Sequence, residues 1–173
     1  GPELFGLPFE EWLFFISVPY ALLFLWEQIQ AYAFGPERWE WPEQFLARRV
    51  VPALQIASIL VVSYATWQGW WYTATVSIVF FVSWLLVQWV AQRSNRLSLG
   101  GCQLWNFLGF TIVLTLIFNG YLTWEPVVVY NDLLNSSLRV GTIPVEDIVY
   151  GVSMALGLVG VYEYKTLLLA QDV

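Results

Sequence analysis

Five long apolar stretches, separated by short polar joints, dominate the chain. They cover residues 8–34, 44–64, 70–92, 103–123 and 144–169. A helix crosses the bilayer core in about 20 residues, so each stretch is long enough to span a membrane. The stretches lack the alternation of apolar and polar residues that a membrane β-strand shows. The pattern therefore predicts an all-α, polytopic transmembrane helix bundle of about five spans, built as a single membrane domain over residues 1–173.

The residues at the ends of these stretches support this prediction. As in the aromatic belt of a membrane interface, tryptophans gather near the stretch ends: Trp39, Trp41, Trp67, Trp70, Trp71 and Trp124. With five alternating spans, every basic residue except Arg139 falls on one side of the membrane: Arg38, Arg48, Arg49, Arg93, Arg96 and Lys165. The positive-inside rule makes that side cytoplasmic, which predicts a cytoplasmic C-terminus.

Composition and charge exclude several classes of protein. Charged residues make up only 12% of the chain, against about 25% in soluble domains, so a soluble enzyme is excluded. A net charge of −6 with seven basic residues argues against a nucleic-acid partner. With one cysteine and no histidine, the chain offers no multi-Cys or His-ligated metal site and no Ser-His catalysis. We therefore expect no metal and no cofactor, and chemistry carried by carboxylates and aromatic rings.

A short motif occurs twice, at an offset of 136 residues. The first copy reads Gly6-Leu7-Pro8-Phe9-Glu10-Glu11-Trp12, and the second reads Thr142-Ile143-Pro144-Val145-Glu146-Asp147-Ile148. Further along, Leu25-Trp26-Glu27 corresponds to Val161-Tyr162-Glu163 at the same offset. The copies begin the first and fifth predicted spans, which run in the same direction. We therefore expect a duplicated fold, with both acidic pairs at one membrane face and Glu27 and Glu163 near the other.

The acidic pairs Glu10-Glu11 and Glu146-Asp147 admit two interpretations. The helix dipole stabilises acidic residues in the first turn by about 0.3–1 kcal/mol, so each pair can simply cap a membrane helix that opens with proline. The alternative is catalytic, because an ionisable residue inside a span is costly and usually serves a function. A carboxylic acid there can donate a proton and a carboxylate can accept one. Repetition of the pair favours catalysis, whereas snorkelling or pairing with Lys165 or Arg38 is sufficient for Glu27 and Glu163.

Two blocks of the sequence resemble a known enzyme family. The first is Leu7-Pro8-Phe9-Glu10-Glu11-Trp12-Leu13-Phe14-Phe15. The second is Glu125-Pro126-Val127-Val128-Val129-Tyr130-Asn131-Asp132, followed by Gly141-Thr142-Ile143-Pro144-Val145-Glu146-Asp147. In this order and spacing they are similar to the membrane-integral lycopene cyclases of bacteria, archaea and fungi, which consist of two homologous halves. The resemblance implies cyclase-like halves at residues 6–92 and 101–169, in a bacterial or archaeal cell membrane.

The resemblance also implies an activity, the closure of lycopene ends to β- or ε-ionone rings by isomerisation without a cofactor. One carboxylic acid protonates the terminal alkene, and a carboxylate removes a proton after the ring closes. The implied catalytic residues are Glu10, Glu11, Glu146 and Asp147. Aromatic faces near such a site can stabilise a carbocation. The substrate-binding candidates, from the matching blocks and the nearby aromatic rings, are Pro8, Trp12, Phe15, Glu125, Asn131, Asp132, Pro144 and Tyr150.

One departure from the family pattern leaves a second function open. Fused members carry two further helices before the first Pro-x-Glu-Glu block, and we expect the first half to lack them here. A shortened relative that kept the cavity but lost the reaction would be a non-catalytic carotenoid-binding subunit of a larger membrane pigment–protein complex. The expected partners are therefore a carotenoid, the lipid bilayer, and either the missing helices, a second subunit or a larger complex. A transporter half is weaker, because the repeated helices are parallel and no broken helix lies at mid-span.

Overall fold

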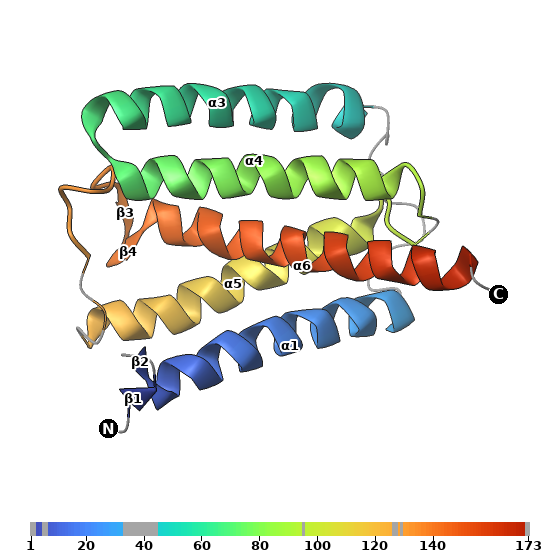
Figure 1. Cartoon of the computed structure of the whole chain (residues 1–173), viewed down its shortest axis with the longest axis horizontal. Helices are drawn as coiled ribbons and strands as arrows, with labels where there is room; N and C mark the ends of the chain where they lie inside the picture. The colour runs from blue at the N-terminus through green and yellow to red at the C-terminus, as the bar shows by residue number, and fades with distance from the viewer. Residues whose placement is uncertain are drawn as a thin grey trace.

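In the described part of the chain, five long helices that alternate in direction form a bundle (Figure 1). The computed structural model describes residues 3–4, 7–32, 45–94, 96–125, 128 and 130–171, with the backbone alone at residues 3–4, 7–11, 46–47 and 171. The helices are α1 (Phe9–Tyr32), α3 (Val51–Gln68), α4 (Trp71–Ala91), α5 (Cys102–Trp124) and α6 (Val145–Gln171). A π-helical turn, η1 (Leu46–Val50), leads into α3. All five helices are long and apolar enough to cross a membrane, which confirms the predicted polytopic helical class.

The second predicted span differs most from the observed helix. It was expected to end at residue 64, but α3 continues to Gln68. The polar residues of the last turn stay helical because Gly69 supplies the left-handed C-cap, with a φ of 79°. The chain then turns directly into α4, and the Trp70 N–H donates to the Ala65 carbonyl at 2.8 Å. Polar composition at an interface is therefore a poor marker of where a membrane helix ends.

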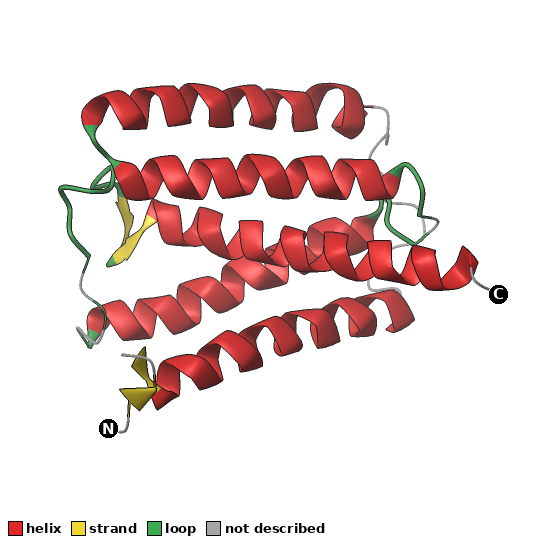
Figure 2. Ribbon diagram, in the orientation of Figure 1, coloured by secondary structure: helices red, strands yellow, loops and turns green. Residues whose placement is uncertain are grey.

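Each of the two motif-bearing helices is preceded by a small hairpin, which the sequence did not predict (Figure 2). Strands β1 (Glu3–Leu4) and β2 (Leu7–Pro8) precede α1, and β3 (Arg139–Val140) and β4 (Ile143–Pro144) precede α6. The paired residues of the first hairpin, Glu3 with Pro8 and Leu4 with Leu7, recur in the second at the 136-residue offset of the motif. Each motif proline therefore ends a strand instead of opening the helix. The duplication extends to backbone conformation.

Helix α6 occupies the centre of the bundle and packs against α4, α5 and α1, whereas α3 packs on α4. Two glycines on α6 allow this close packing. A Cβ at Gly160 would lie 2.8 Å from Leu86 of α4, and one at Gly151 would lie 2.7 Å from Thr115 of α5. Small residues at such contacts are typical of membrane helices, where van der Waals packing holds neighbours together. The buried core that results is made chiefly by Trp26, Trp84, Val87, Phe107, Leu156 and Val159.

The outer surface of the bundle is apolar, as lipid contact requires. Large side chains are exposed on every helix, for example Ile16 of α1, Leu60 of α3 and Ile117 of α5. The topology also distributes the basic residues unequally between the two ends of the bundle. The end where α1 and α6 finish carries Arg93, Arg96 and Lys165, and the opposite end carries Arg139. Five apolar helices place the protein in a membrane; the cytoplasmic side assigned from the basic residues stays a prediction.

Candidate functional site

Two acidic side chains, Glu146 and Asp147, are buried in the first turn of α6. Each is 4% exposed. The loop after α5 covers them and is held in place by two backbone hydrogen bonds. The Tyr72 N–H of α4 donates to the Leu134 carbonyl, and the Val145 N–H at the start of α6 donates to the Leu138 carbonyl, both at 3.0 Å. Burial of these carboxylates thus follows from a loop fastened across the end of the bundle.

The two oxygens of the Glu146 carboxyl group have different surroundings. Thr73 of α4 donates its hydroxyl to Oε1 at 2.6 Å, and the Ser136 N–H donates to the same oxygen at 2.8 Å. The other oxygen, Oε2, is buried and has no hydrogen-bond partner among the described residues. Buried polar atoms are nearly always paired, so an unpaired carboxyl oxygen is a candidate for function. Glu163 also has an unpaired Oε2, but its Oε1 lies 3.8 Å from the Arg96 guanidinium, whereas no described cation is paired with Glu146. Glu146 therefore offers one anchored oxygen and one available oxygen.

Asp147 accepts hydrogen bonds from three side chains on different segments. The Tyr72 hydroxyl donates to Oδ1 at 2.5 Å, and Asn119 of α5 donates to Oδ2 at 3.2 Å. The Tyr130 hydroxyl also donates to Oδ2. Tyr130 lies outside the spans, and burial together with this hydrogen bond raises its pKa above the ordinary value of 10.0. The phenol therefore stays protonated, and a donor, throughout the physiological pH range.

Among the side chains that the structure describes, no basic residue is paired with this acidic pair. Within residues 12–32, 48–94, 96–125 and 130–170, the ion pairs join Arg96 to Glu27 and Glu163, and Arg139 to Asp132. Glu146 and Asp147 are instead held by neutral hydroxyl, amide and backbone donors. The rings of Tyr72 and Tyr130 stack beside Asp147, with centroids 6.4 Å apart and planes at 29°. Two carboxyl groups, neutral donors and aromatic faces make a site suited to proton transfer near a cation.

The sequence-predicted residues of the second motif are only partly brought together here. Pro144 is buried beside the acidic pair in the chain, whereas Tyr150, one turn further along α6, is 43% exposed. Glu125, Asn131 and Asp132 are exposed. Asn131 accepts the Leu133 N–H at 3.0 Å, and Asp132 pairs with Arg139 at 2.5 Å. These contacts shape the loop, and the loop reaches the acidic pair through Tyr130 and Ser136.

The first motif begins α1, but its acidic side chains lie outside the described part of the structure. The backbone places Pro8 at the end of β2 and Glu10 and Glu11 in the first turn of α1. Of the aromatic candidates that follow, Trp12 is half-buried and Phe15 is 53% exposed. The catalytic prediction for Glu10 and Glu11 therefore rests on the equivalence of the two hairpin–helix units.

Sequence reasoning did not select four of the residues that hold the acidic pair: Tyr72, Thr73, Asn119 and Ser136. The adjacent Tyr72 and Thr73 could have been found, because they begin the third span at the same membrane face as the second motif. Asn119 lies near the end of the fourth predicted span, and it donates from α5 to α6. Ser136 acts through its backbone N–H, which no side-chain pattern reveals.

At the opposite end of the bundle, the second part of the repeat forms a reciprocal pair of contacts. Trp26 of α1 donates to Glu163 of α6 at 2.8 Å, and Tyr162 of α6 is hydrogen-bonded to Glu27 of α1. Arg96 lies 2.6 Å from Glu27 and 3.8 Å from Glu163. Among the described residues, Arg96 takes the place of the predicted partner Lys165, whereas the other predicted partner, Arg38, lies outside the described part of the chain. Snorkelling is wrong for Glu163, which is 1% exposed.

Comparison with known proteins identifies one related family. The family model described as lycopene cyclase matches residues 1–29 and 48–165. No curated protein and no solved structure was found to match. Among the residues that the structure describes, no three His, Cys, Asp or Glu side chains are grouped as metal ligands. The matched region contains both acidic motifs, the covering loop and the five described membrane-spanning helices, apart from the last residues of α1 and of α6.

Proposed function

The chain belongs to the lycopene cyclase family, and on this basis we propose that it closes the acyclic ends of a lycopene-type carotenoid into rings, with Glu146 and Asp147 as its acid–base pair. Glu10 and Glu11, in the equivalent position of α1, are the further catalytic candidates. Carotenoid cyclisation is the activity of the family. The proposal concerns the residues that carry this activity in the present chain.

The proposed reaction is an isomerisation that needs one proton donor and one proton acceptor. A proton adds to the terminal carbon–carbon double bond and leaves a carbocation. The electrons of a second double bond then close the six-membered ring and move the positive charge into it. Loss of a proton from a carbon beside that charge forms the ring double bond. No electron is gained or lost overall, and the position of the lost proton decides the ring type.

The unpaired Oε2 of Glu146 is the observation that carries the proposal. Both protein donors converge on Oε1, as they would on the carbonyl oxygen of a carboxylic acid. That arrangement leaves Oε2 as the hydroxyl oxygen, with its proton directed to a substrate alkene. Positioned acids and bases contribute about 10²–10⁴-fold to rate. We assign proton donation to Glu146 on this asymmetry.

Asp147 is the proposed proton acceptor, with Tyr72, Tyr130 and Asn119 as residues that position it. All three contacts are donations to Asp147, so the carboxylate is held in place before substrate arrives. The stacked Tyr72 and Tyr130 rings lie beside it, and desolvated aromatic faces stabilise a cation by about 2 kcal/mol or more. A base next to aromatic faces suits removal of a proton from a ring cation.

Expression in lycopene-accumulating cells tests this function directly. The wild-type protein is expected to produce cyclic carotenes, and Glu146→Gln is expected to abolish them while the protein remains in the membrane. Glu163→Gln is the matched control, because Glu163 is a buried carboxylate of the same helix at the opposite end of the bundle. Chromatography of the extracted carotenes, with immunodetection of the membrane fraction, gives both readouts. Wild-type amounts of product from Glu146→Gln would reject the assignment.

The same experiment distinguishes the second candidate, a carotenoid-binding subunit without activity. An apolar groove on α6, described below, is the observation that favours it. In that case the purified wild-type protein would retain lycopene in stoichiometric amount and leave it acyclic. It would also co-purify with a larger membrane assembly. Cyclic carotenes formed by the protein alone would exclude this alternative.

A further inference from the structure

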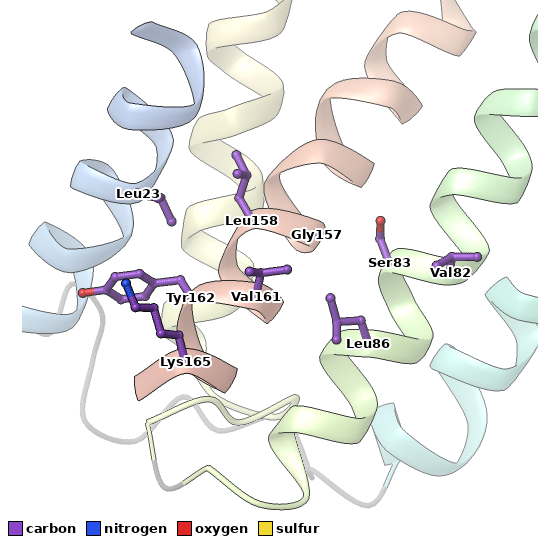
Figure 3. A pocket seen from close by; sticks show the side chains of 9 residues that line it. All are labelled: Leu23, Val82, Ser83, Leu86, Gly157, Leu158, Val161, Tyr162 and Lys165. Carbon is purple, nitrogen blue, oxygen red and sulfur yellow. The ribbon is translucent and has the colours of Figure 1, made fainter. Parts of the chain in front are cut away.

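An apolar groove runs along the outer face of α6, between α1 and α4 (Figure 3). Its volume is about 520 Å³. Leu23 of α1 and Leu86 of α4 form its two sides, and Leu158 and Val161 of α6 form its floor. Tyr162 and Lys165 lie at the end where the helix finishes. The lining is almost wholly hydrocarbon, so its occupant must be an apolar molecule or part of one.

The groove exists because α6 carries a glycine where α4 and α6 face each other. At Gly160 the two helices touch, since a Cβ there would meet Leu86 at 2.8 Å. At Gly157, one turn earlier, the nearest neighbour of an added Cβ is the Ser83 hydroxyl at 3.4 Å. The absent side chain of Gly157 leaves a hollow above a firmly packed contact. The groove is therefore a fixed feature of the helix pairing.

One face of α6 connects this groove with the acidic pair. Asp147, Tyr150, Met154, Leu158, Val161 and Lys165 follow one another at spacings of three and four residues, which places them on one side of a helix. At 1.5 Å per residue, Leu158 lies roughly 16 Å from Asp147 along the helix axis, and Lys165 roughly 27 Å. We call these six residues the α6 stripe. A straight molecule with one end at Asp147 would therefore lie along this stripe and enter the groove.

We propose that the groove holds the polyene chain of the carotenoid whose end group reacts at Glu146 and Asp147. This inference rests on the proposed function. A conjugated polyene is a stiff, extended hydrocarbon, so a substrate held at one end must project along a straight path. The stripe is straight, its groove is apolar, and it opens to the lipid from which a carotenoid arrives. The chain length of the substrate is thus recognised far from the reacting atoms.

Filling the groove without disturbing the core tests this inference. Val161 is 59% exposed, so Val161→Trp places a large ring in the groove while the packed side of α6 stays unchanged. The matched control is Val113→Trp on α5, because Val113 is 51% exposed and lies outside the groove. Each protein is assayed with lycopene and with a truncated polyene that has the same acyclic end but is too short to reach Leu158.

Val161→Trp is expected to lower lycopene conversion roughly tenfold or more and to leave conversion of the truncated polyene at the wild-type level. Turnover of the truncated polyene shows that the variant is folded. A second variant, Val161→Ala, widens the groove and is expected to retain lycopene conversion. Lycopene that co-purifies with the wild-type protein should be lost from Val161→Trp and kept by Val113→Trp.

Three results would overturn the inference. The first is equal lycopene conversion by Val161→Trp and Val113→Trp. The second is that only lipid acyl chains occupy the groove of the purified wild-type protein, and that Val161→Trp retains as much bound carotenoid as the wild type. The third is a change of oligomeric state in Val161→Trp alone, which would make the groove a contact between two copies. If the wild-type protein converts neither polyene, the proposed function is rejected instead. Binding to the groove is then still tested by whether co-purifying lycopene is lost from Val161→Trp and kept by Val113→Trp.

Discussion

The two ends of the bundle each bury acidic side chains of α6, but they hold them in opposite ways. At one end Glu163 receives the Trp26 indole N–H and lies 3.8 Å from the Arg96 guanidinium. At the other end Glu146 and Asp147 are held by neutral donors alone among the described residues. A carboxylate beside a fixed cation is stabilised in its charged form. Under the proposed function, the first end therefore has a structural role and the second end is the one that transfers protons.

The repeat explains why both kinds of carboxylate occur on the same helix. Trp26 and Tyr162 occupy equivalent positions, and each is bonded to the Glu of the other copy. Arg96 completes this reciprocal contact. Although burial opposes its charge, the hydrogen bond to Glu27 and the charge of Glu163 raise the pKa of Arg96 above its ordinary value. The contact joins α1 to α6, so it fixes how the two copies of the motif are placed relative to each other.

Of the changes considered, removal of the charge of Asp147 is expected to have the largest effect on turnover. Asp147→Asn keeps the size of the side chain but removes the proton acceptor, and we expect turnover to fall by about 100-fold. The matched change at the other end, Glu163→Gln, is expected to leave turnover per folded protein unchanged. Carotene formation normalised to membrane protein measures both. The contrast fails if Glu163→Gln loses as much turnover as Asp147→Asn.

Arg96→Met is expected to weaken the fold and not the chemistry. It leaves Glu163 buried without its cation, and since Arg96 is 39% exposed we expect a loss of about 1–3 kcal/mol in stability. The matched control is Arg139→Met, which breaks the more exposed pair with Asp132 and should cost less than about 1 kcal/mol. Thermal inactivation in a fixed lipid–detergent mixture compares them. Unchanged inactivation of Arg96→Met, with lost turnover, would reverse the assignment of the two ends.

Tyr130→Phe is expected to have the smallest of the three effects. It removes one of three donors to Asp147, a hydrogen bond to a charged group, and should lower turnover about tenfold. Because the pKa of Tyr130 is raised, wild-type turnover should not fall as pH passes the ordinary phenol value near 10. Tyr121→Phe, at an exposed tyrosine of α5, serves as the control. A loss of turnover centred at the ordinary phenol pKa would contradict this role for Tyr130.

Most of the fold could be predicted from the sequence because membrane helices depend on length and apolarity. The five apolar stretches and their order correspond to the five helices. The hairpins before α1 and α6 could not be predicted, since strands of two residues are too short to show a period. The four extra residues at the end of α3 were missed because they include the polar Thr66 and Gln68 and the interfacial Trp67, and only Gly69 marks the true end.

The site could be predicted only in part, because its groups meet through the tertiary fold. Repetition singled out Glu146 and Asp147, and both are buried together. Their donors come from α4, α5 and the loop, and no local pattern links Tyr72 or Asn119 to residues that follow them by 75 and 28 positions. Arg96 as partner of Glu27 was missed for the same reason. Lys165 and Arg38 were predicted as partners instead, because they are closer to Glu163 and Glu27 in the chain.

Product formation in heavy water tests the central claim, that the acidic end without a cation transfers a proton to the substrate. In D₂O, an acid that exchanges with solvent delivers deuterium to the inner carbon of the terminal double bond, so mass spectrometry should find one deuterium in each ring formed. Glu163→Gln should give the same labelled product, and Glu146→Gln should give none. Rings that form without deuterium, or labelled product from Glu146→Gln in wild-type amount, would contradict the account.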